Sequence, residues 1–306
     1  MNERVLSTAI IPVAGLGTRD APFTYGVPKF MIPVYAGNQA IPNINFALEE
    51  CIDAGIENIV LVVDADGREQ LERYIKAMPD DRRERYLRVG KMAALEDEER
   101  FRKAHGQLNI EYIVQSTQEY GTAIPTWLAL NAAQPALGGV EYVAVTGGDD
   151  YVWHVDGTSE LALAKASWQQ QATAHAIMGA PVPREVAPTK GILTVNDRQQ
   201  LVTILECPDG SPEQPIPDEP LANISRYIFR IPDIQPILNS YVKGTLPEGQ
   251  KEYRITDVVN QMIAARQEVA VHTIQGTYLD TGNPEAARFA SNYMTRELLK
   301  ARRHQS

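Results

Sequence analysis

The chain has few of the residues that mark secreted, disulfide-bonded or metal-caged proteins. Its 306 residues include only two cysteines, Cys51 and Cys207, which lie far apart. They form neither a disulfide framework nor a paired-cysteine zinc motif. The five histidines show no metal-ligand spacing. We therefore expect a protein of the reducing cytoplasm that folds without structural disulfides.

Long apolar runs and an excess of positive charge are also missing. No apolar segment approaches the roughly 18 residues of a membrane-spanning helix, and the N-terminus lacks the layout of a signal peptide. The formal net charge is -10, whereas a nucleic-acid-binding protein needs a basic face to meet the phosphate backbone. We expect no membrane and no nucleic acid as partner. A mononucleotide is not excluded, because a few local donors can hold one.

What the chain does contain is an alternation of apolar strands and amphipathic helices. Residues 5–13 predict a buried strand that ends in a glycine turn. A helical stripe over 43–54, capped by Gly55, leads to a second apolar strand over 56–63. Strands that are apolar on both faces are typical of a parallel sheet covered by helices. We predict one doubly wound α/β domain over residues 1–306, with a mostly parallel sheet. Further strands are expected over 110–114, 141–146, 175–178, 192–195, 221–229 and 269–274, and further helices over 68–78, 122–133, 257–266 and 284–306.

One segment departs from this alternation. More than half of residues 80–104 are charged, with both signs mixed. Such a stretch is either a partner-binding surface or a solvated helical excursion from the domain, and mixed charge favours the excursion.

The most informative segment is the glycine turn after the first strand. Gly15 and Gly17 let backbone N–H groups approach a phosphate with no Cβ in the way. The turn is not a dinucleotide fingerprint, since Asp20 stands at the third glycine position, and it lacks the Gly-Lys-Ser/Thr ending of a P-loop. Arg19 and Lys29 follow, and cations beside backbone donors suit transfer from a triphosphate. The pattern alone leaves open an ordinary glycine turn with surface cations.

Acidic residues stand at two further strand or turn positions. Asp149 and Asp150 close an apolar strand, where open α/β sheets bind ligands. Asp280 precedes a Thr-Gly turn and the last helix. Carboxylates there suit Mg2+, a hard cation that shares its shell with phosphates. The same residues could instead cap a helix or form a turn.

Two stretches resemble a known family. Residues 9–19 (AIIPVAGLGTR) and 28–33 (PKFMIP) are similar to the signature of the sugar-1-phosphate nucleotidylyltransferases, and weaker similarity continues to Gly282. The resemblance implies that family's Rossmann-like nucleotidyltransferase fold. It also implies transfer of a nucleoside monophosphate to a sugar 1-phosphate with release of pyrophosphate. The residues are most like those of the bacterial uridylyltransferases, so UTP and glucose 1-phosphate are the default substrates.

The resemblance also implies a role for residues along the whole chain, an Mg2+ cofactor and a homo-oligomer. The implied roles are triphosphate binding by Ala14, Gly15, Gly17 and Thr18, catalysis by Arg19 and Lys29, base recognition by Gln115 and Gly121, metal binding by Asp149 (rather than Asp150) and Asp280, and acceptor binding by Gly191 and Glu206.

Two positions depart from the family pattern. Cys207 stands where a lysine normally grips the sugar 1-phosphate, and Tyr25 where lysine is common. A thiol cannot replace an ammonium beside a phosphate. Either Lys190 supplies the charge from a neighbouring strand, or the acceptor differs, for example a cyclitol phosphate or a phosphonate. A third interpretation is an inactive, sugar-nucleotide-binding regulatory paralogue, against which the retained Arg19 and Lys29 count.

Overall fold

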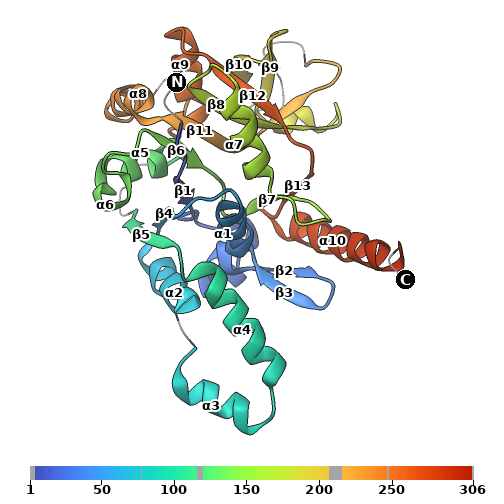
Figure 1. Ribbon diagram of the computed structural model, residues 1–306. Helices are drawn as coiled ribbons and strands as arrows, with labels where there is room; N and C mark the ends of the chain where they lie inside the picture. Colours follow the sequence, from blue (N-terminus) through green and yellow to red (C-terminus); the bar gives the residue numbers. More distant parts are fainter. Residues whose placement is uncertain (1–3, 77, 116–119, 207–215, 247, 305–306) are drawn as a thin grey trace.

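The computed structural model describes residues 4–76, 78–115, 120–206, 216–246 and 248–304. Within these ranges the chain builds a nine-stranded sheet with helices on both faces (Figure 1). Its strands are β1 (Thr8–Pro12), β4 (Asn58–Val63), β5 (Asn109–Val114), β6 (Tyr142–Val145), β8 (His175–Pro181), β9 (Ile192–Val195), β10 (Leu201–Leu205), β11 (Leu221–Arg230) and β12 (Val269–Thr273).

The sheet runs in the order β10-β9-β11-β6-β1-β4-β5, with β8 beside β11 and β12 beside β8. Strands β6, β1, β4 and β5 are mutually parallel, whereas β11 is antiparallel to β6, β8 and β9. The predicted α/β fold is confirmed. The parallel strands carry the first half of the chain, and β11 joins them to a mixed second half, in which β8 and β12 are parallel.

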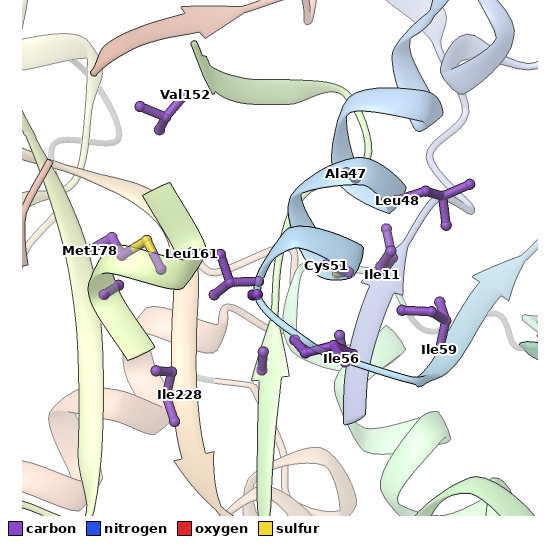
Figure 2. Close-up of a cluster of buried hydrophobic side chains, with 14 of the residues drawn as sticks. Ile11, Ala47, Leu48, Cys51, Ile56, Ile59, Val152, Leu161, Met178 and Ile228 are labelled. Carbon is purple, nitrogen blue, oxygen red and sulfur yellow. The ribbon is translucent and has the colours of Figure 1, made fainter. Parts of the chain in front are cut away.

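Helices cover the two faces of this sheet because neighbouring residues of its buried strands point to opposite sides. Ile11 of β1 packs in a cluster with Leu48 and Leu161 (Figure 2), while Ile10 packs with Ala129 and Leu238 on the other face. The helices on this sheet are α1 (Asn43–Asp53), α2 (Ala65–Ile75), α5 (Ala123–Ala132), α6 (Gln134–Leu137), α7 (Glu160–Gln170), α8 (Ile231–Lys243) and α9 (Ile255–Ala264). The last helix, α10 (Pro284–His304), packs mainly on the small strand pairs that flank the sheet.

The ends of two helices test the sequence predictions. Helix α1 ends as predicted, because Gly55 adopts a φ of +67° and Ile56 N–H donates to the carbonyl of Cys51 at 2.9 Å. Helix α2 begins earlier than the predicted residue 68. Its true cap is Asp64, whose carboxylate accepts from Gly67 N–H at 2.6 Å.

Smaller elements flank the sheet. Two-stranded ribbons are formed by β2 (Pro33–Ala36) with β3 (Gln39–Pro42) and by β7 (Asp150–Trp153) with β13 (Thr277–Asp280). The charged stretch forms two helices, α3 (Asp80–Arg88) and α4 (Met92–His105), which extend away from the sheet (Figure 1). None of the helices in the described ranges is long and apolar enough to cross a membrane.

Candidate active site

The glycine turn lies directly after β1, at the carboxyl ends of the parallel strands. Gly17 has a φ of +60°, and a Cβ there would lie 2.8 Å from Cγ2 of Thr24, so the turn itself requires glycine. Gly15 is different, since a Cβ on it would meet nothing within 4 Å. The space around Gly15 therefore leaves its backbone open to a ligand, and no contact of a Cβ with the described residues requires glycine there. Ala14 and Thr18 flank these glycines, and Thr18 begins a short 3-10 turn.

Lys29 and Asp149, which are 120 residues apart, form an ion pair beside this turn. Lys29 lies in a short 3-10 turn and its side chain is 11% exposed, whereas that of Asp149 is 41% exposed. Gly282 is adjacent, because a Cβ on it would lie 3.1 Å from Nη2 of Arg19 and 3.5 Å from Nζ of Lys29. The two cations predicted from the glycine turn therefore converge on one point.

A second ion pair completes the cluster. Lys190 Nζ lies 3.2 Å from Oδ2 of Asp280, and both side chains are partly exposed. Burial raises the pKa of Asp280, but the Gly282 N–H and the charges of Lys190 and Arg19 outweigh it, so the pKa is below its usual value. Asp280 is thus an ionised carboxylate in a cationic environment.

The carboxylates of Asp149 and Asp280 are brought together by the β7–β13 ribbon. Asp280 is the register partner of Asp150, and Thr281 N–H donates to the carbonyl of Asp149 at 3.1 Å. The side chain of Asp150 points the other way, into a buried contact with Arg226 at 2.6 Å. Of the two consecutive acids, Asp149 is therefore the one that belongs to the cluster of Lys29 and Arg19.

These two carboxylates fit the requirements of Mg2+. The ion is usually held by one or two carboxylates, with water and substrate phosphates completing its shell. Asp149, just before β7, and Asp280, the last residue of β13, both offer partly exposed carboxylate oxygens. Within the described residues no group of three or more His, Cys, Asp or Glu could cage a metal alone, and a site shared with phosphates does not need one.

The predicted base-reading residues lie at the end of β5 and the start of α5. Gln115 donates its backbone N–H to Val63 at 2.7 Å, and its buried Oε1 has no partner among the described residues. Gly121 has a structural reason of its own, because a Cβ there would lie 2.2 Å from the carbonyl oxygen of Tyr253. Gln115 Oε1 is therefore available to accept a hydrogen bond from a ligand, whereas glycine is required at position 121 by the nearby backbone of Tyr253.

The predicted acceptor residues meet across β9 and β10. A Cβ on Gly191 would lie 3.0 Å from Oε1 of Glu206, so the glycine leaves room for that carboxylate. Lys190, next to Gly191, reaches Asp280 and thus joins the acceptor side to the cation cluster. Cys207 lies outside the described residues. Tyr25 is 84% exposed.

A cleft of about 980 Å³ opens beside the glycine turn. It is lined by Gly15, Tyr25 and Lys29 together with residues of α2 and α4. The predicted base and acceptor residues do not line it. The cleft therefore reaches the triphosphate side of the site and continues toward the charged helices.

Polar residues behind the cluster were not predicted from the sequence. One is Arg226, a fully buried arginine in β11, whose signal was a charge directly before the apolar run Tyr227–Phe229. Another is Glu160, whose carboxylate accepts from His154 Nε2 at 2.8 Å and His272 Nε2 at 2.7 Å. Glu160 also accepts from Gly276 N–H at 2.9 Å. It thereby holds in place the turn between β12 and β13, and Asp280 is the last residue of β13.

Comparison with known proteins agrees with this geometry. Residues 8–297 match the nucleotidyl transferase family. The chain is 30% identical over 280 residues to the UTP–glucose-1-phosphate uridylyltransferase of Bacillus subtilis (strain 168), covering 90% of this chain and 86% of that protein. It is 28% identical over 283 residues to that of Staphylococcus epidermidis (strain ATCC 12228 / FDA PCI 1200), covering 90% and 88%. A solved UDP-glucose pyrophosphorylase complexed with UDP-glucose superposes with a TM-score of 0.76 at 26% identity, covering 96% of this chain and all of that one. The chain belongs to the nucleotidyl transferase family.

Proposed function

We propose that this protein transfers UMP from UTP to a sugar 1-phosphate, with glucose 1-phosphate as the default acceptor, and releases pyrophosphate. The observation that carries the proposal is the convergence of Arg19, Lys29 and Lys190 with Asp149 and Asp280 at one edge of the sheet. Support also comes from the similarity to uridylyltransferases over most of the chain.

The reaction needs no protein nucleophile. An oxygen of the acceptor phosphate attacks the α-phosphorus of UTP, a new P–O bond forms, and the bond to the β-phosphate oxygen breaks as pyrophosphate leaves. Charge accumulates on the phosphate oxygens during this exchange, so orientation and charge neutralisation carry the rate.

Each part of the site has a task in this exchange. The backbone around Gly15 and Gly17 holds the triphosphate, and Arg19 with Lys29 neutralises the oxygens around the transferring phosphorus. Asp149 and Asp280 are the residues that would hold Mg2+. When bound there, that ion polarises the phosphoryl oxygens and helps to orient the phosphates. Before substrates arrive, Lys29 and Lys190 balance the two carboxylates.

The acceptor side is where this chain differs from its family. Lys190 is placed beside Asp280, where it would offer the acceptor phosphate the positive charge that Cys207 lacks. Glu206 beside Gly191 would accept hydrogen bonds from sugar hydroxyls. Gln115, whose Oε1 has no partner in the part of the chain that the structure describes, would read the uracil edge. A homo-oligomer stays a prediction.

The decisive test is pyrophosphate release, measured with Mg2+ across the common nucleoside triphosphates and a panel of sugar 1-phosphates. We expect the highest kcat/KM with UTP and glucose 1-phosphate, and loss of release when EDTA removes the metal. No release with any pair, despite nucleotide binding, would refute the proposal and favour a regulatory protein.

A second candidate rests on Cys207 and Tyr25, which change the acceptor side and leave the glycine turn intact. The same chemistry would then act on another phosphate or phosphonate acceptor, such as a cyclitol phosphate. Release with UTP and such an acceptor, but not with sugar 1-phosphates, would establish this alternative.

A further inference from the structure

Arg226 is a fully buried charged residue of the central strand β11, next to an irregularity of that strand. The pairing of β11 with β8 shifts register between Asn223 and Tyr227. Within this irregularity Ser225 adopts a φ of +56°, a conformation that non-glycine residues rarely take. Both faces of β11 are covered here, so Arg226 is buried on the face that Ile228 shares with Glu50 of α1, and Tyr227 is buried on the opposite face.

The guanidinium joins three separate elements. It lies 3.3 Å from Oε2 of Glu50 in α1 and 2.6 Å from Oδ1 of Asp150 in β7. It also donates to the backbone carbonyl of Asp150 at 2.9 Å. The other carboxylate oxygen of Asp150 accepts from Tyr278 of β13 at 2.9 Å. Asp150 is thus held by its side chain and its backbone, from two sides.

This hold determines where the neighbouring acid points. Asp149 directly precedes β7, and its side chain turns to Lys29 while that of Asp150 is held in the interior by Arg226. Gly147 leaves room for this arrangement, since a Cβ on it would lie 2.6 Å from Oδ1 of Asp150. The position of Asp280 also depends on Asp150, because the two residues are register partners in the β7–β13 pair.

We propose that Arg226 is a positioning residue for the phosphate-transfer site. Acting through Asp150, it sets the direction of Asp149 and the place of Asp280 without touching a substrate. The inference rests on the function proposed above. Stability alone does not account for such a network, because buried ion pairs are often no more stabilising than well-packed apolar side chains. Mutation of residues that hydrogen-bond to metal-binding side chains typically lowers metal affinity by about 10- to 100-fold.

The test uses the double variant Arg226→Met/Asp150→Asn, which removes a positive and a negative charge together. Its matched control is Arg230→Met/Asp233→Asn, which removes an ion pair of 3.0 Å from the end of the same strand. For each folded protein we would measure Mn2+ binding with UTP by electron paramagnetic resonance, kcat and KM for UTP, and the thermal midpoint.

The expected result is at least about 10-fold weaker Mn2+ binding and a kcat at least about 10-fold lower, with KM for UTP changed less than about threefold. The control variant should bind Mn2+ as the wild type does. A folded double variant with wild-type Mn2+ binding and kcat would overturn the positioning role. Wild-type protein that releases no pyrophosphate would instead refute the proposed function, and the positioning role with it.

A milder variant covers the case in which the double variant does not fold. Tyr278→Phe removes only the hydroxyl that binds Asp150. It should weaken Mn2+ binding by about threefold while the thermal midpoint changes little, and Arg226→Lys should retain part of the affinity. Wild-type Mn2+ binding by Tyr278→Phe would count against the proposal.

Discussion

Replacing Lys29 by alanine should slow catalysis by about 10²-fold or more while leaving the fold intact. Two unit charges 4 Å apart interact by about 4 kcal/mol at an effective dielectric constant of about 20, and by about 1 kcal/mol in bulk water. The side chain of Lys29 is only 11% exposed, so the interaction energy at the lower dielectric constant, about 4 kcal/mol, is the relevant one. Loss of a single preorganised donor to a developing oxyanion costs about 2.7–4 kcal/mol.

The same geometry predicts which kinetic constant changes. The charge of Asp149 already balances Lys29 in the free protein, so the full benefit of the lysine appears only when charge develops on the transferring phosphate. We expect kcat to fall much more than KM for UTP rises. Asp149 is 41% exposed, so it stays hydrated without its partner and the thermal midpoint should change little.

Pyrophosphate release under saturating UTP and acceptor measures this effect, with Lys76→Ala as the control. Lys76 also lines the 980 Å³ cleft, but its side chain is 73% exposed and lies 3.7 Å from Glu72. Its removal should change kcat by less than about twofold. A kcat for Lys29→Ala within about threefold of wild type would remove Lys29 from the mechanism.

Three further predictions concern the acceptor side and the supports of the site. Lys190→Met should raise KM for the sugar 1-phosphate by about 10-fold in steady-state kinetics, and adding Cys207→Lys should restore KM if the two positions share one task. An unchanged KM for Lys190→Met would show that Lys190 does not bind the acceptor phosphate. Ser225 has a φ of +56°, so Ser225→Val should lower the free energy of unfolding by about 1–2 kcal/mol and Ser225→Gly should not; denaturant unfolding that ranks them equally would contradict this reasoning. Burial raises the pKa of Glu160, but hydrogen bonds from two histidines and two backbone N–H groups outweigh it and lower the pKa to about 2. Because the pKa is lower in the folded state, ionised Glu160 adds roughly 3 kcal/mol to the free energy of unfolding above about pH 4.5, and this contribution is lost as the pH falls toward 2. In Glu160→Gln, the free energy of unfolding should lack this part of its pH dependence, which denaturant unfolding across this pH range would measure.

Local patterns in the sequence predicted the elements whose causes are local. The apolar run before Gly15 gave a strand because every side chain of β1 except the last is buried. The end of α1 was predictable because Gly55 alone can take the left-handed conformation there without strain. The start of α2 was misplaced although its cause is also local. The cap at Asp64 lies immediately after an apolar strand, and hydrophobic periodicity does not mark such a residue.

The short ribbon β7–β13 shows where local patterns end. Each of its strands has only four residues, too few for a clear alternation, and its pairing joins segments more than 120 residues apart. The choice between Asp149 and Asp150 depends on that ribbon and on Arg226 from a third segment. In the sequence, residue type and position do not distinguish the two acids, and only the family resemblance favoured Asp149.

The glycine turn, its two cations and the acidic strand ends were predictable from residue order alone, because the chemistry of these residue types does not depend on the fold. The family was predictable too, through residues that lie together in the chain. That Lys29 meets Asp149 and Lys190 meets Asp280 became clear from the folded chain. Those contacts depend on sheet order and strand register, which distribute charge in space in a way that spacing along the chain does not encode.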